Sequence, residues 1–118
     1  MKTGKTIDNK YSKWLGSQPC LITGKKAKRG TYPNNMHCHH VRGRKHGLQN
    51  DYIQVPLIGD VHNYYHNKGA TEFIKKYSLV CNIIISDDIK QNHRSLIAWF
   101  EEHASKYYNK YTKMEKTK

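Results

Sequence analysis

The chain has 118 residues and a mass of 13.9 kDa, which suffices for one domain with a single modest core but not for two. Its 21 Lys and Arg residues against 9 Asp and Glu residues give a formal charge of +12 with neutral histidines, which favours a polyanionic partner, with nucleic acid ahead of an acidic membrane surface. Three widely spaced cysteines argue against a disulfide framework, and no apolar run approaches the roughly 18 residues of a membrane span, so we expect a soluble cytoplasmic protein.

The two ends of the chain are polar and carry lysines. We therefore expect flexible segments over residues 1–10 and 109–118, where lysines can touch phosphates. Residues 11–108 between them are expected to form a single domain, in which a core over about 36–69 is followed by helical support over about 70–108.

The domain opens with a predicted short helix. Tyr11, Trp14 and Leu15 have helical spacing, and the segment stops at Gly16. The stretch 24-GKKAKRGTYPNN-35 follows, and its Gly, Pro and paired Asn residues predict a loop. Its basic side chains suit a surface that faces phosphates, and we assign them to nucleic-acid binding: Lys25, Lys26, Lys28 and Arg29.

Two short strands and a helix are predicted next. Val, Ile and Tyr are enriched over residues 37–41 and 52–57, on either side of the turn-prone, basic stretch 43–51. After Pro56 the apolar spacing becomes helical and persists to Lys68, with glycine just beyond as a C-cap. The predicted order is strand, loop, strand, helix.

Histidines on this unit predict a metal site. His62 and His66 are four residues apart on the predicted helix, so both rings project from one face and can converge on one ion. A helix packed on a two-stranded ribbon brings the end of the first strand over that face. The third ligand would therefore be His39 or His40.

The last third of the domain has the pattern of packing elements. Phe73, Ile74 and Tyr77 form an amphipathic stripe, and an apolar run over 79–85 precedes a predicted helix start at 86–88. A long helix is expected beyond it, with apolar side chains at helical spacing, whereas His93 and His103 are expected to be surface histidines rather than ligands.

Taken together, these motifs resemble a known family. The order 39-HH-40, Asn50-Asp51, 56-PL-57 and 62-HNYYH-66 resembles the ββα-metal fold of the HNH (His-Me finger) endonucleases. Within that superfamily, the chain is similar to the phage Ref-like HNH nucleases, which act with the recombinase RecA, over the stretches 14-WLGSQPCLITG-24, 39-HHVRG-43, 51-DYIQVPL-57 and 62-HNYYH-66. The resemblance covers roughly residues 11–78.

This resemblance implies a fold and an activity. The fold would be α+β, with a small ββα-metal centre braced by flanking helices. The activity would be metal-dependent hydrolysis of DNA phosphodiester bonds with low sequence specificity, in phage DNA recombination or processing inside the bacterial host cell. The partners implied are DNA and a RecA-like recombinase filament.

Residue roles follow from the same resemblance. The second histidine of the pair, His40, would be the general base, with Asp51, or failing that Asn50, holding its ring. One divalent ion, Mg, Mn or Zn, would be bound by His39, His62 and His66. The loop beside the metal carries basic side chains that would grip flanking phosphates: Arg42, Arg44, Lys45 and His46.

One feature of the family is missing. Relatives commonly carry paired cysteines, or cysteine and histidine, that hold a structural zinc, but the corresponding positions here read Cys20, Thr23, Ile58 and Val61. One thiol cannot hold a tetrahedral zinc. We expect no Cys-ligated zinc, and a small apolar contact among Cys20, Ile58 and Val61 in its place.

Two other functions remain open at this stage. The first is a noncatalytic nucleic-acid-binding module in which His39, His40, His62 and His66 enclose one zinc ion and leave no position for water. The second is a recombination mediator that retains the HNH shape and uses only its basic surface.

Overall fold

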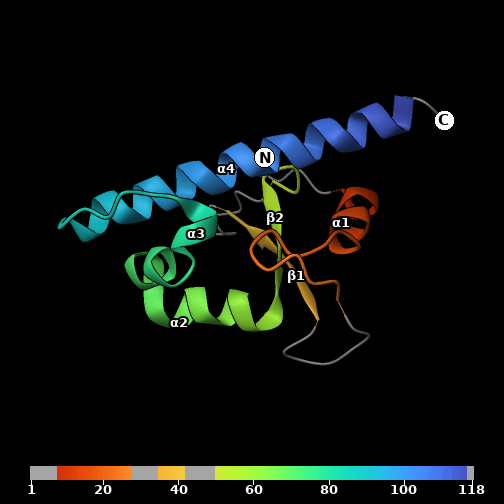
Figure 1. Cartoon of the computed structure of the whole chain (residues 1–118). Helices are drawn as coiled ribbons and strands as arrows, with labels where there is room; N and C mark the ends of the chain where they lie inside the picture. The colour runs from red at the N-terminus through yellow and green to blue at the C-terminus, as the bar shows by residue number, and fades with distance from the viewer. Residues whose placement is uncertain (1–7, 28–34, 42–49, 117–118) are drawn as a thin grey trace, which may run out of the picture.

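A computed structural model describes residues 8–27, 35–41 and 50–116. Its elements, in chain order, are α1 (Asn9–Gly16), β1 (Met36–His40), β2 (Gln54–Ile58), α2 (Gly59–Lys76), α3 (Ser78–Cys81) and α4 (Ile89–Lys116). The protein therefore has an α+β fold. Figure 1 shows α4 running along the length of the molecule, with the two strands between α1 and α2.

The two strands form an antiparallel hairpin that runs directly into a helix. Met36 pairs with Ile58 and His40 with Gln54, so the predicted pair of strands is confirmed, with boundaries shifted by one or two residues. Successive side chains of a strand point to opposite faces. Consequently His37 and His39 share the face toward α2, while His40 points to the other face, toward α1.

Helix α2 is interrupted at one glycine. Gly69 has φ 86° and ψ 178°, a backbone conformation that glycine adopts at little cost. We predicted that the helix would end here, but the chain resumes a helical course and reaches Lys76. The second part forms because Ala70, Phe73 and Ile74 are buried in the main core, which holds this segment in place.

Helix α4 begins where the sequence indicated. The Oδ1 atom of Asp88 accepts the amide of Lys90 at 2.9 Å. The buried Asn92 side chain bonds both the amide and the carbonyl of Ser86, at 2.8 and 2.9 Å, and donates to Thr71 at 2.9 Å. The start of α4 is thereby tied to α2 as well as to its own turn.

The end of α4 corrects one expectation. We expected a flexible segment from residue 109 onward, but the helix continues to Lys116. The ring of Tyr111 is buried, with its centroid 5.0 Å from that of Tyr11 and 5.2 Å from that of Trp14. The apolar stripe of α4 thus extends beyond the main core and packs on α1, which keeps the last turns helical.

Apolar side chains are exposed from α3 to the first residue of α4. Leu79 is 99% exposed, Ile84 92% and Ile89 73%, whereas Cys81 in the same segment is buried. The apolar run over 79–85 therefore contributes little to the core. None of the helices in the described residues is both long and apolar enough to cross a bilayer.

Candidate metal centre

Three histidine side chains from β1 and α2 converge. His62 and His66 are one turn apart on α2, and His39 projects toward them from β1. The Nδ1 atom of His39 lies 3.2 Å from Nε2 of His62, which lies 3.0 Å from Nε2 of His66. One ring nitrogen from each residue lies within 4.8 Å of the other two, so the group could hold a metal ion. Of the two candidates for the strand position, the structure brings His39 to this group.

The contacts among these rings suit metal binding better than hydrogen bonding. In a neutral imidazole each ring nitrogen carries either a proton or a lone pair, so Nε2 of His62 cannot donate to one neighbour and accept from the other. Nitrogens bound to one tetrahedral ion at about 2.0–2.1 Å lie about 3.3 Å apart. The observed separations of 3.2 and 3.0 Å are close to that spacing.

Burial keeps two of these histidines neutral. The pKa of His39 is lowered to about 3, first by burial and then by His62, His66 and His40. The pKa of His62 is lowered to about 4, again first by burial and then by its neighbours His66 and His37. Both rings are uncharged at neutral pH, and uncharged imidazole is the form that binds metal.

The histidines open into a cleft of about 900 Å³. Residues from both faces of β1 line this cleft. They include His39, His62 and His66 on one side and His40 and Asp51 on the other.

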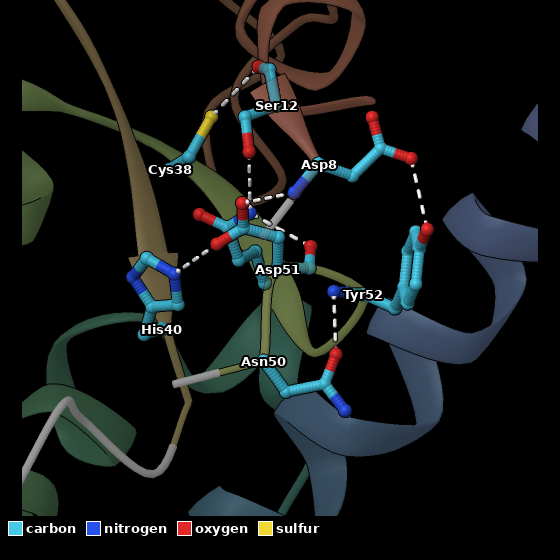
Figure 2. A network of polar contacts seen from close by, with 8 residues as sticks. Asp8, Ser12, Cys38, His40, Asn50, Asp51 and Tyr52 are labelled. Carbon is cyan, nitrogen blue, oxygen red and sulfur yellow. Dashed lines mark hydrogen bonds and ion pairs between the residues drawn. The ribbon is translucent and has the colours of Figure 1, made fainter. Parts of the chain in front are cut away.

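His40 has a different environment from the other three. Its Nε2 atom lies 2.9 Å from Oδ1 of Asp51, and both side chains are buried (Figure 2). Asn50, the other candidate partner, is turned away, and its Oδ1 accepts the amide of Tyr52 at 2.9 Å. Asp51 therefore lies beside the His40 ring, and Asn50 orders the turn before β2.

Sequence reasoning missed the groups that surround Asp51. The backbone amide of Asp8 donates to Oδ2 of Asp51 at 2.7 Å, and the side-chain amide of Gln54 donates to the Asp51 carbonyl at 2.7 Å. Tyr52 donates its hydroxyl to Asp8 at 2.9 Å. An Asp before a helical segment is a recognisable N-cap. The contact across 43 residues from Asp8 to Asp51 leaves no local signal.

His37 is a further histidine at the centre to which we gave no role. Its ring stacks on that of His62, with centroids 4.7 Å apart and an interplanar angle of 29°. Its Nε2 atom lies 3.0 Å from the side-chain amide nitrogen of Asn35. His93 was expected on the surface and its side chain is exposed, although it also lines the cleft.

Only two of the basic residues that we assigned to DNA binding lie among the described residues. Lys25 and Lys26 are exposed and are not among the residues that line the cleft. The other assigned side chains lie outside the described residues: Lys28, Arg29, Arg42, Arg44, Lys45 and His46.

Three of the four positions at which HNH nucleases commonly hold a structural zinc are packed as core in this chain. Cys20, Ile58 and Val61 are buried in one cluster, as expected, and the Cys20 sulfur accepts the amide of Ile58 at 3.3 Å. Thr23 is exposed and takes no part in that cluster. The segment after α1 is therefore joined to β2 and α2 by direct packing around a thiol.

The site thus combines two chemical units, a group of three imidazoles able to bind a metal ion and a buried histidine paired with a carboxylate. A search of protein-family models, curated proteins and solved structures finds no match to this chain.

Proposed function

We propose that the protein is a metal-dependent HNH endonuclease that hydrolyses DNA phosphodiester bonds with low sequence specificity. The observation that carries the proposal is the placement of the His40–Asp51 pair and the His39, His62 and His66 group on opposite faces of one strand, around one cleft. The order of hairpin and helix agrees with a ββα-metal centre. The setting would be phage DNA recombination or processing.

The three imidazoles would hold the catalytic ion. Nitrogen ligands suit Zn²⁺ and other transition ions better than Mg²⁺, although the family resemblance admits Mg, Mn or Zn. When bound there, the ion supplies Lewis-acid chemistry, stabilising charge on the scissile phosphate and on the leaving oxygen.

His40 would act as the general base. Because Nε2 faces the carboxylate of Asp51, that nitrogen carries the ring proton, and Nδ1 is the atom that takes the proton of the attacking water. Asp51 holds the ring in this tautomer and stabilises the imidazolium that forms. The base then acts without being a metal ligand.

DNA would be attracted by the charge of +12 and held by phosphate contacts. The loop residues Arg42, Arg44 and Lys45 are the proposed grip beside the metal, and a RecA-like filament is the proposed protein partner. Removing the three charges should weaken binding for every DNA sequence. The slope of log affinity against log salt concentration should become shallower by about 0.7–0.9 for each phosphate contact that is lost. An unchanged salt slope would move the DNA path to Lys25, Lys26, Lys28 and Arg29.

The geometry argues against a closed zinc site of four histidines. His40 points to the face of β1 opposite His39 and is bonded to Asp51, so it does not complete a group with His62 and His66. A recombination mediator would bind DNA without cutting it, so a cleavage assay distinguishes it from a nuclease.

The deciding experiment is cleavage by the purified protein. Supercoiled duplex and single-stranded DNA are incubated with Mg, Mn or Zn ions, and in parallel with a chelator, using the wild type and His40→Ala. We expect metal-dependent cleavage by the wild type that the chelator and the substitution both abolish. Tight DNA binding without cleavage under any metal would reject the nuclease in favour of the mediator.

A further inference from the structure

Helix α1 lies outside the hairpin and the three-histidine group, yet the residue that caps its N-terminus, Asp8, contacts the buried acid Asp51. The amide of Asp8 donates to Oδ2 of Asp51 at 2.7 Å, while Oδ1 of the same carboxylate faces Nε2 of His40 at 2.9 Å. Figure 2 shows the carboxylate of Asp51 between these two partners. Each oxygen has its own partner, so the carboxylate cannot rotate without breaking both contacts.

The position of the Asp8 amide depends on the Asp8 side chain. Oδ1 of Asp8 accepts the amide of Tyr11 at 3.0 Å, which caps α1, and Oδ2 accepts the Tyr52 hydroxyl at 2.9 Å. These two bonds lower the pKa of Asp8, with the Tyr11 amide contributing first, and the side chain is therefore ionised at neutral pH. Asp8 is thus fixed from both sides, by its own helix and by the residue that follows Asp51.

Two further bonds join α1 to the same turn. The side-chain amide of Gln54 donates to the hydroxyl of Ser12 at 2.9 Å and to the carbonyl of Asp51 at 2.7 Å. Gln54 is buried, and in β2 it pairs with His40. Both the side chain and the backbone carbonyl of Asp51 are therefore linked to the start of α1.

We propose that Asp8 is a positioning residue for His40, which acts by fixing its own backbone amide on Asp51. This inference rests on the proposed function, because it concerns the orientation of the general base. Asp8 reaches the His40 ring only through Asp51. Its loss should leave metal affinity and DNA affinity intact and lower turnover, since a base displaced by about 1 Å can cost on the order of 100-fold in rate.

The test compares Asp8→Ala with two matched variants. Asp8→Asn keeps an oxygen that can cap α1 and an amide that can donate to the Tyr52 oxygen, so it is the rescue variant. Ser17→Ala is the control, because it removes a hydrogen bond to Trp14 at the far end of the same helix. Turnover at saturating DNA and metal, DNA affinity, metal affinity and melting temperature are measured for each.

We expect turnover to fall about 10-fold to 100-fold in Asp8→Ala, and to stay within about threefold of the wild type in Asp8→Asn and Ser17→Ala. Affinities for DNA and metal should be unchanged in all three. Turnover of Asp8→Ala within threefold of the wild type would overturn the proposal. An equal loss in Asp8→Asn or Ser17→Ala would also overturn it, because the effect would then be general damage to α1.

A second readout is independent of cleavage. The nitrogen chemical shifts of the His40 ring, recorded by NMR, report which nitrogen carries the proton. We expect the Nε2–H form in the wild type and a mixture of tautomers in Asp8→Ala, and identical spectra would reject the positioning role even if the protein cuts no DNA. If the wild type does not cleave DNA, the proposed nuclease function is rejected, whereas the proposed positioning role of Asp8 is still tested by the NMR spectra. Should Asp8→Ala fail to fold, Tyr52→Phe removes one anchor of Asp8 and keeps the ring, and the same two readouts apply.

Discussion

The ring of His40 and the carboxylate of Asp51 are joined by a contact of 2.9 Å between two buried side chains, one at the end of β1 and the other in the turn before β2. The contact lies on the face of β1 opposite the three histidines that could hold a metal ion. No side chain therefore belongs both to the pair that contains the proposed base and to the proposed set of metal ligands. Their substitutions should produce different defects.

Replacing His40 by Ala should remove cleavage but not metal. General-base removal typically costs about 10²- to 10⁴-fold in rate, and the three nitrogens of the metal group remain in place. Single-turnover cleavage and metal titration of the same preparation check this. A large loss of metal affinity would show that His40 is a ligand, and a near-normal rate would show that it is not the base.

Replacing His66 by Ala should have the reverse effect. Its side chain is exposed, so stability should change little, but two remaining imidazoles hold a divalent ion weakly. We expect metal affinity and turnover to fall together while DNA affinity stays within about threefold. His103→Ala removes a histidine of α4 that is outside the cleft, and should retain both properties. Metal binding by His66→Ala equal to that of the control would contradict the assignment.

The metal-free protein should lose stability in acid. The pKa of His39 is about 3 in the folded chain, against an ordinary value of 6.5, so between these values the unfolded chain binds more protons. Stability should therefore decline as the pH falls from about 6.5 toward 3, by up to about 1.4 kcal/mol per pH unit from this group.

Urea unfolding in the presence of a chelator, at several pH values, measures this slope. The variant His39→Gln cannot titrate at this position and should show a shallower slope. Equal slopes for the two proteins would mean that other groups cause the acid sensitivity.

Replacing Tyr111 by Ala should destabilise the fold. The ring packs on Tyr11 and Trp14 of α1, so its loss leaves a gap between α1 and α4. We expect the melting temperature to fall by on the order of 10 °C. The neighbouring exposed side chain provides a control, since Lys110→Ala should shift the melting temperature by less than about 2 °C. If both substitutions lower the melting temperature by a similarly small amount, residues from 109 onward would behave as the flexible tail that the sequence predicted.

Cys20→Ser should be mild. The thiol accepts one backbone amide and fills a buried position, so the substitution should cost about 1–2 kcal/mol without unfolding the protein. Elemental analysis should find at most one tightly bound transition metal per chain. Two metals, or loss of the fold in Cys20→Ser, would show that this cysteine holds a structural ion.

Much of the site could be predicted because its signals are local. Four-residue spacing places His62 and His66 on one helical face. The third ligand stayed open between His39 and His40 until the family resemblance assigned it to His39. The choice between Asp51 and Asn50 could not be made in this way, because it depends on how the turn before β2 is folded. In the structure that turn uses Asn50 for its own backbone and leaves Asp51 to face the ring.

The rest depended on contacts between distant segments. Gly69 does interrupt α2, but burial of Phe73 and Ile74 restores the helix beyond it. Tyr111 lies in a polar stretch that reads as a tail, and only its packing on α1 shows that it is part of the core. Neither effect is visible in a window of a few residues.

The packing of α1 against the last turns of α4 also bears on synthesis of the protein. Tyr11 contacts Tyr111, 100 residues later in the chain, and Asp8, the N-cap of α1, donates the amide that holds Asp51. A nascent chain can acquire this packing only after residue 111 has left the ribosome, although the hairpin and the three histidines have emerged well before. The contact between Asp8 and Asp51, which orients the carboxylate beside His40, would thus be set later than the hairpin and the group of three histidines.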